Sequence, residues 1–141
     1  MFAATKNQAK AYATVGIETV VASATPYSLI LMLFDGALLS LSSASMYLAQ
    51  NQVAEKGQAI SKAIDIISNG LSASLDLKIG GELAERLFSL YEYMANRLLH
   101  ANIHNDAAAI DEVAHLLGEL RSAWAEIAQD PAVVSGNRVA A

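Results

Sequence analysis

The sequence lacks cysteine, and this absence excludes disulfide bonds as a source of stability. A chain of 141 residues is nevertheless long enough to bury a core without such crosslinks. Positive charge is scarce, because 9 basic and 14 acidic residues give a formal net charge of −5. Without a basic cluster, binding to nucleic acid or to an anionic membrane surface gains little from electrostatics, so we expect neither partner.

Long hydrophobic runs are also missing. The densest run, Leu29–Phe34, is followed directly by Asp35, whereas a membrane-spanning helix needs about 20 apolar residues. We therefore expect no membrane insertion. Near the N-terminus, two lysines precede a semi-apolar stretch that ends in Ala22-Ser23-Ala24, as in a signal peptide, but Glu18 interrupts that stretch. The pattern favours an N-terminal arm over a cleaved signal peptide.

Proline is rare, and Pro26 and Pro131 bracket a region in which apolar residues recur three and four positions apart. Thr25 followed by Pro26 is a typical helix start. Asn69-Gly70 would ordinarily indicate a hairpin, but the flanking period is helical, so we expect an internal glycine. Gly80-Gly81 and Asn105-Asp106 separate further helices. The predicted helices are about 25–50, 55–78, 81–104 and 106–128.

Four amphipathic helices with short connections predict an all-α, antiparallel four-helix bundle over residues 25–128. A partly ordered N-terminal arm over 1–24 and a flexible tail over 129–141 complete the expected organisation. The expected core residues are Leu31, Leu38, Ile64, Ile67, Leu87, Met94, Leu117, Leu120 and Trp124.

Apolar residues make up 54% of the chain and charged residues only 16%, which is more apolar surface than one bundle seam requires. Around Leu29–Phe34 the first helix is hydrophobic almost all round, so it is either central or covered by something else. Surplus apolar surface is typical of a protein that binds a partner. The plainer alternative is that single apolar residues are scattered over the surface, as in most proteins.

Patterns for catalysis or metal binding are weak. Glu112 and His115 form one E-x-x-H pair, but a di-metal bundle needs two such pairs and further glutamates. His100 and His104 lie one helical turn apart and lack a third ligand. No nucleophile elbow or glycine-rich phosphate loop occurs. We therefore expect no enzyme activity, no catalytic residues, no metal site and no cofactor, and we disfavour a metal-dependent oxidase.

Several short sequence blocks occur in order between Lys10 and Ile127. They are Lys10-Ala11-Tyr12, Ala24-Thr25-Pro26, Met32-Leu33-Phe34-Asp35-Gly36-Ala37, Ser61-Lys62-Ala63-Ile64-Asp65-Ile66-Ile67, Asn69-Gly70-Leu71, Ser74-Leu75-Asp76, Gly80-Gly81-Glu82-Leu83-Ala84, Leu90-Tyr91-Glu92-Tyr93-Met94, Arg97-Leu98-Leu99, Ala101-Asn102-Ile103-His104-Asn105-Asp106 and Ala123-Trp124. Over nearly its whole length the chain therefore resembles the flagellin-specific export chaperones of the FliS family.

The resemblance implies a cytoplasmic chaperone that binds the disordered C-terminal segment of flagellin in apolar grooves around the bundle. Such a chaperone prevents premature polymerisation and helps to deliver flagellin to the flagellar type III export gate. The resemblance also implies that the N-terminal arm, with Tyr12, covers part of the groove when flagellin is absent. The family often has a larger apolar residue shortly before this tyrosine, where this chain has Gln8-Ala9, so we expect weaker covering here.

Helical faces that remain after the core is assigned supply the predicted partner-binding residues. They are Tyr12, Leu29, Leu33, Ile66, Tyr93, Leu99 and Leu116. Recognition through such faces would lay an amphipathic helix of the client into an apolar groove. The alternative is a structural bundle that uses the same faces to form a homo-oligomer, in the simplest case a weak homodimer, without any other partner.

Overall fold

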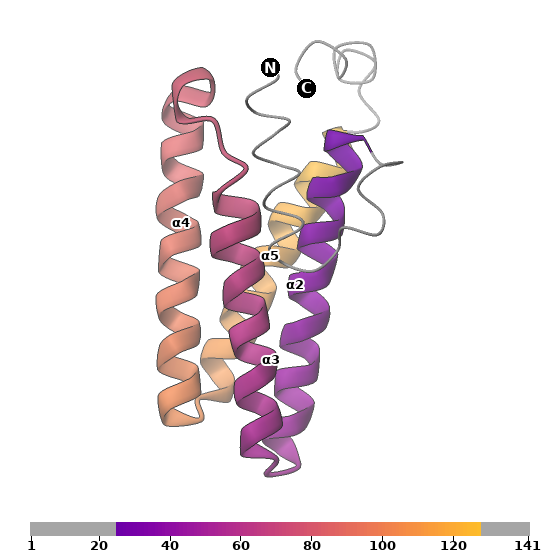
Figure 1. The fold of residues 1–141 in the computed structure, drawn as a ribbon, viewed down its shortest axis with the longest axis vertical. Helices are drawn as coiled ribbons and strands as arrows, with labels where there is room; N and C mark the ends of the chain where they lie inside the picture. The colour runs from indigo at the N-terminus through magenta and orange to yellow at the C-terminus, as the bar shows by residue number, and fades with distance from the viewer. Residues whose placement is uncertain (1–24, 128–141) are drawn as a thin grey trace.

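The computed structural model describes residues 25–127, and its helices run alternately up and down one long axis (Figure 1). The elements are α2 (Pro26–Ala49), α3 (Val53–Asp65), the π-helical segment η2 (Ile66–Ser72), α4 (Leu77–His104) and α5 (Ala107–Ile127). The described residues contain helices and turns and no strand, which confirms an all-α bundle. The predicted arm, including Tyr12, and the predicted tail lie outside the described residues.

Side-chain caps decide where two of the helices begin. The Thr25 hydroxyl accepts a hydrogen bond from the Ser28 amide at 3.1 Å, and Pro26 occupies the first turn, so α2 starts there. The Asp76 carboxylate accepts hydrogen bonds from the amides of Lys78 and Ile79 at 3.1 and 3.0 Å. Because of this cap, α4 begins at Leu77 and not at the expected position 81.

Two residues with a positive φ interrupt or end α4. Gly81 has a φ of 56° and a ψ of −134°, so it kinks α4 one turn after its start. Asn105 adopts the left-handed conformation, with a φ of 52°, and ends α4. Asp106 then starts α5, because its carboxylate accepts a hydrogen bond from the Ala109 amide at 3.2 Å.

The second predicted helix differs most from the structure. Regular α-helix ends at Asp65, and the chain continues as the π-helical η2, which contains Asn69 and Gly70. The Asn69 amide nitrogen donates to Asp65 Oδ1 at 2.6 Å on the outer surface of this segment. A π-helical turn accommodates an extra residue relative to an α-helix. The helical spacing of apolar residues alone gave no sign of this change.

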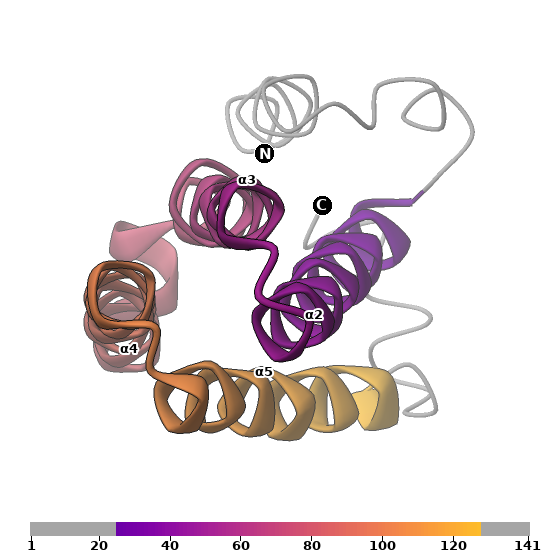
Figure 2. The ribbon, with the colours of Figure 1, turned by 90° about the horizontal axis from the view of Figure 1, so that it is seen from below.

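Helix α2 lies between α3 and α5, and α4 closes the bundle against α3 and α5 (Figure 2). The core of buried side chains comes from all of the described helices. Its members include Leu33, Phe34, Ala37, Leu41, Ala44, Ile60, Ala63, Ile66, Ile67, Leu71, Met94, Leu98, Ala101, Ala109, Ile110, Val113 and Leu117.

The predicted core is correct for Ile67, Met94 and Leu117, which are fully buried. Five more of the predicted residues are half-buried and pack against the core: Leu38, Ile64, Leu87, Leu120 and Trp124. The predicted inward face of α2 was wrong at Leu31, which is half-buried. Leu29, Leu33 and Ala37 face the core instead. Apolar residues surround this helix at its start, so their spacing could not identify the inward face.

Among the described helices, α2 is the one that is long and apolar enough to span a membrane by length and composition. The fold accounts for this composition differently. Ala37, Leu41 and Ala44 are fully buried, and α2 packs against both α3 and α5. The apolar character of α2 therefore matches its position as the central helix of the bundle.

A buried lysine connects the start of α3 to the turn between α4 and α5. Lys56 is only 1% exposed. Its Nζ donates to the Asn102 carbonyl at 2.8 Å and to Asn105 Oδ1 at 2.7 Å. Because buried ammonium groups require hydrogen-bond acceptors, these two contacts hold α3 to the C-terminal end of α4, where the turn to α5 begins.

Candidate functional site

The predicted partner-binding residues differ in their burial in the structure. Leu29, Leu33 and Ile66, which were expected on a partner-facing surface, are buried in the core in this conformation. Tyr93 and Leu99 are exposed on α4. Leu116 is half-buried on α5 and packs against the core. Tyr12 lies outside the described residues.

Helix α5 changes its neighbour along its length. In its first half, Glu112 accepts hydrogen bonds from the Tyr93 hydroxyl and from Arg97 Nε of α4, the latter at 2.9 Å. In its second half, Arg121 Nε donates to Asp35 Oδ1 of α2 at 2.8 Å. Figure 2 shows the same course, with α5 starting beside α4 and ending beneath α2. The helix therefore diverges from α4 as it approaches its C-terminal end.

The contacts of Glu112 also affect its charge. The hydrogen bond from Tyr93, followed by that from Arg97, lowers the pKa of the Glu112 carboxyl from its ordinary value. Glu112 is therefore used to attach α5 to α4. This leaves it unsuited to the metal role considered for the E-x-x-H pair.

An apolar pocket opens where α5 diverges from α4, and its volume is about 290 Å³. It is lined by Ile30, Phe34, Leu71, Ser74, Leu75, Leu83, Leu87, Tyr91, Leu120, Ala123, Trp124 and Ile127. Phe34 and Leu71 are buried and form its floor, whereas Leu83 and Ile127 are exposed and border its mouth. Because eleven of the twelve side chains are hydrocarbon or aromatic, the pocket suits an apolar ligand.

Helix α4 carries most of the remaining exposed apolar surface. Seven of the eleven large hydrophobic residues that are exposed within residues 25–127 belong to this helix. They are Leu77, Ile79, Leu83, Phe88, Tyr93, Leu99 and Ile103. Leu83 belongs to this set and to the pocket mouth, so the apolar pocket and the exposed residues of α4 meet there. Exposed apolar residues concentrated on one element indicate a protein-binding surface.

Tyr91 lines the apolar pocket and is buried there, which raises the pKa of its phenol to about 12. Since this pKa is higher in the folded state, deprotonation favours unfolding. We expect the contribution of Tyr91 to stability to be constant below pH 10 and to fall by about 1.4 kcal/mol per pH unit between pH 10 and 12. The difference in the free energy of unfolding between the wild type and Tyr91→Phe, measured by urea unfolding across this pH range, gives this contribution. An equal decline in both proteins would contradict the assignment.

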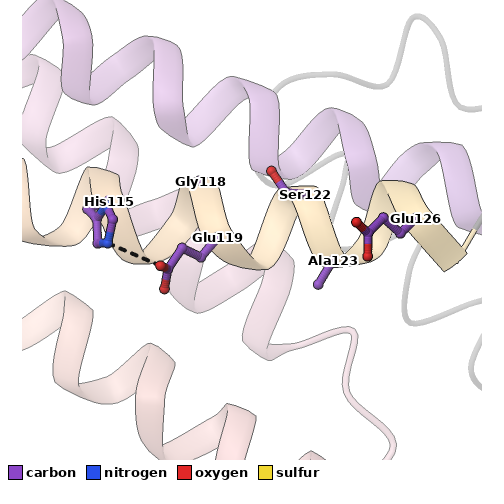
Figure 3. Close-up of a pocket in the computed structure, with 6 residues that line it drawn as sticks. All are labelled: His115, Gly118, Glu119, Ser122, Ala123 and Glu126. Carbon is purple, nitrogen blue, oxygen red and sulfur yellow. Dashed lines mark ion pairs between the residues drawn. The ribbon is translucent and has the colours of Figure 1, made fainter.

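A second hollow lies on the outer face of α5, and all six of its lining residues belong to that one helix (Figure 3). His115 and Glu119 face each other there, with His115 Nε2 3.2 Å from Glu119 Oε1. Both side chains are exposed, so this pair adds little to stability. Within residues 25–127 no group of three His, Cys, Asp or Glu side chains could hold a metal ion. His115 therefore pairs along α5 and not with Glu112.

A helical bundle that leaves an apolar pocket and a set of exposed apolar side chains on one helix has the features of a polypeptide-binding protein. Comparison with known families specifies the class further. The family described as "Flagellar protein FliS" matches residues 8–131. The chain belongs to the FliS family of flagellar secretion chaperones, whose function is chaperoning and not catalysis.

Three relatives illustrate the similarity. The flagellar secretion chaperone FliS of Salmonella typhimurium strain LT2 is 54% identical over 118 residues, which cover 84% of this chain and 87% of that protein. FliS of Escherichia coli K12 is 44% identical over 134 residues, covering 95% and 97%. FliSB of Pseudomonas aeruginosa PAO1 is 47% identical over 115 residues, covering 82% and 90%. The family match over residues 8–131 includes the whole described bundle.

Proposed function

We propose that this chain is a cytoplasmic chaperone that binds the disordered C-terminal segment of flagellin, prevents its premature polymerisation and helps to deliver it to the flagellar type III export gate. The apolar pocket between α4 and α5 is the observation that carries this proposal. The relatives are named flagellar secretion chaperones, which supports an export substrate as the client.

The pocket gives this binding a physical basis. A segment that becomes helical only on contact has an apolar face that it cannot bury alone, and ordering it costs about 2–5 kcal/mol. Burial of apolar surface contributes about 25 cal/mol per Å², so a few hundred Å² already exceeds that cost before rigid-body entropy is counted. The pocket supplies a concave site, and Leu99 and Tyr93 supply further exposed contacts along α4.

The client would be held without nucleotide hydrolysis. Covering the apolar face of the flagellin segment competes with the contacts that the segment makes in a filament. Release then requires only that another partner bind one of the two proteins more tightly. Transfer at the export gate fits this scheme. Tyr12 and the N-terminal arm remain a predicted cover for the groove in the free chaperone.

Size-exclusion chromatography with light scattering tests the proposal. We expect the full-length chain to form a one-to-one complex with flagellin and no complex with flagellin that lacks its C-terminal segment. Salt should weaken the complex little, because apolar contacts depend only slightly on ionic strength. A homodimer of the chain that persists in the presence of flagellin, with no mixed complex, would instead support the structural homo-oligomer.

A further inference from the structure

Two aromatic residues join the first turn of α2 to the last turn of α5, beside the apolar pocket. The rings of Tyr27 and Trp124 stack, with centroids 5.2 Å apart and planes 10° from parallel. The Tyr27 hydroxyl donates to the Trp124 carbonyl at 2.6 Å, and Trp124 Nε1 donates to the Tyr27 carbonyl at 3.0 Å. Each side chain therefore binds the backbone of the other residue. We call this pair the aromatic clasp.

The aromatic clasp fixes the pocket wall that is formed by the C-terminal half of α5, which has diverged from α4. Within residues 25–127, the polar side-chain contacts that α4 makes with α5 and its cap involve Glu112 and Asp106, both in the half of α5 away from the pocket. Near the pocket, α5 is attached to α2 by the clasp and by the Arg121–Asp35 ion pair. That ion pair is exposed, and exposed pairs contribute little. The clasp is therefore the main polar constraint on this wall.

The two members of the clasp differ in their access to a client. Trp124 lines the apolar pocket, so its substitution would change the binding surface itself. Tyr27 is half-buried and is not among the lining residues. Tyr27 is connected to the pocket through Trp124, so we expect it to affect client binding through the position of Trp124 and of the end of α5.

We propose that Tyr27 is a positioning residue for client binding, which fixes the C-terminal end of α5 through the aromatic clasp and so keeps the apolar pocket at its binding width. This inference rests on the proposed function. When only a fraction of molecules has the competent geometry, the apparent affinity falls by that fraction. One hydrogen bond of this kind changes an equilibrium by about fivefold.

The substitution Tyr27→Phe tests this role, because it keeps the stacked ring and removes only the hydroxyl that binds the Trp124 carbonyl. In calorimetry with the full-length chain and a peptide of the flagellin C-terminal segment, we expect binding to weaken by more than about twofold and by at most about tenfold, because the affinity cannot fall further than the equilibrium shifts. Trp124 is the single tryptophan, so its fluorescence reports on the clasp directly. The emission of the free protein should shift on Tyr27→Phe.

Two controls separate positioning from general stability and from the proposed site. Lys56→Met acts at the far end of the bundle, at the turn between α4 and α5, and should leave peptide affinity within about twofold. Equal losses of affinity in Lys56→Met and Tyr27→Phe would mean that binding follows stability, and would overturn the inference. Leu83→Glu changes the mouth of the pocket directly and should weaken binding strongly.

The outcomes for Leu83→Glu and Tyr27→Phe distinguish the two proposals. Weak binding by Leu83→Glu together with wild-type binding by Tyr27→Phe would keep the pocket as the site and reject the positioning role. Wild-type binding by Leu83→Glu would reject the pocket as the client site and the inference with it, whatever Tyr27→Phe does. Reduced binding by both variants, with Lys56→Met unaffected, is the result that we expect.

Discussion

Replacing Leu83 by glutamate should weaken binding of the flagellin C-terminal segment by about thirtyfold or more while leaving the chaperone folded. Leu83 borders the mouth of the apolar pocket and is 68% exposed in the free protein. A client helix over the pocket would enclose the new carboxylate among apolar groups, and an unpaired charge in such a place costs at least about 2 kcal/mol. Isothermal titration calorimetry measures the loss.

Leu39→Glu is the matched control for this prediction. Leu39 is 70% exposed on α2 and does not line the pocket, so the two substitutions add the same charge at equally open positions. Each should change the free energy of unfolding by only about 0.5 kcal/mol. If Leu39→Glu weakens binding as much as Leu83→Glu, the client contacts are spread over the bundle and the pocket has no special role.

Replacing Lys56 by methionine should destabilise the bundle by about 2–3 kcal/mol, a large part of the stability of a domain of this size. Methionine retains most of the aliphatic volume but cannot donate a hydrogen bond. The Asn102 carbonyl and Asn105 Oδ1 then lose a charged donor at a site where Lys56 is almost fully buried. Urea unfolding, monitored by circular dichroism, gives the difference.

Two further variants show whether the hydrogen bonds are the cause. Lys78→Met removes an exposed lysine at the start of α4 and should change stability by less than about 0.5 kcal/mol. Asn105→Gly preserves the left-handed backbone and removes the acceptor side chain. Lys56→Met should therefore cost less in the Asn105→Gly background. Purely additive effects would show that the Lys56–Asn105 bond is not a source of stability.

Much of the helical architecture could be predicted from the spacing of apolar residues and from the residue types that cap helices. Thr25, Pro26 and Asp106 act at helix starts as their residue types predict. The Gly81 kink lies at the predicted break, although the cap at Asp76 moves the start of α4 earlier. The buried Lys56 could not be predicted, since an isolated lysine in a helix is normally solvated and its acceptors lie far away in the sequence.

The candidate site was harder to predict than the fold. Leu87 and Trp124 stood out as members of apolar stripes, but periodicity assigned them to the core of the bundle. Their role as pocket walls depends on the divergence of α5 from α4, which is a property of tertiary packing. The burial of Leu29 and Leu33 has the same origin, because a helix that is apolar on every side gives no internal indication of which side its neighbours cover.

The π-helical segment η2 continues directly from α3 and sets the angular position of its own last residues relative to that helix. Each residue advances an α-helix by about 100°, so one residue fewer between Ile66 and Ser72 would turn the later side chains by that angle. Leu71 would then turn away from Phe34, and the floor of the pocket would lose one of its two members. A deletion of a single codon in this stretch would therefore open the floor of the pocket, which a point substitution on its walls would leave in place.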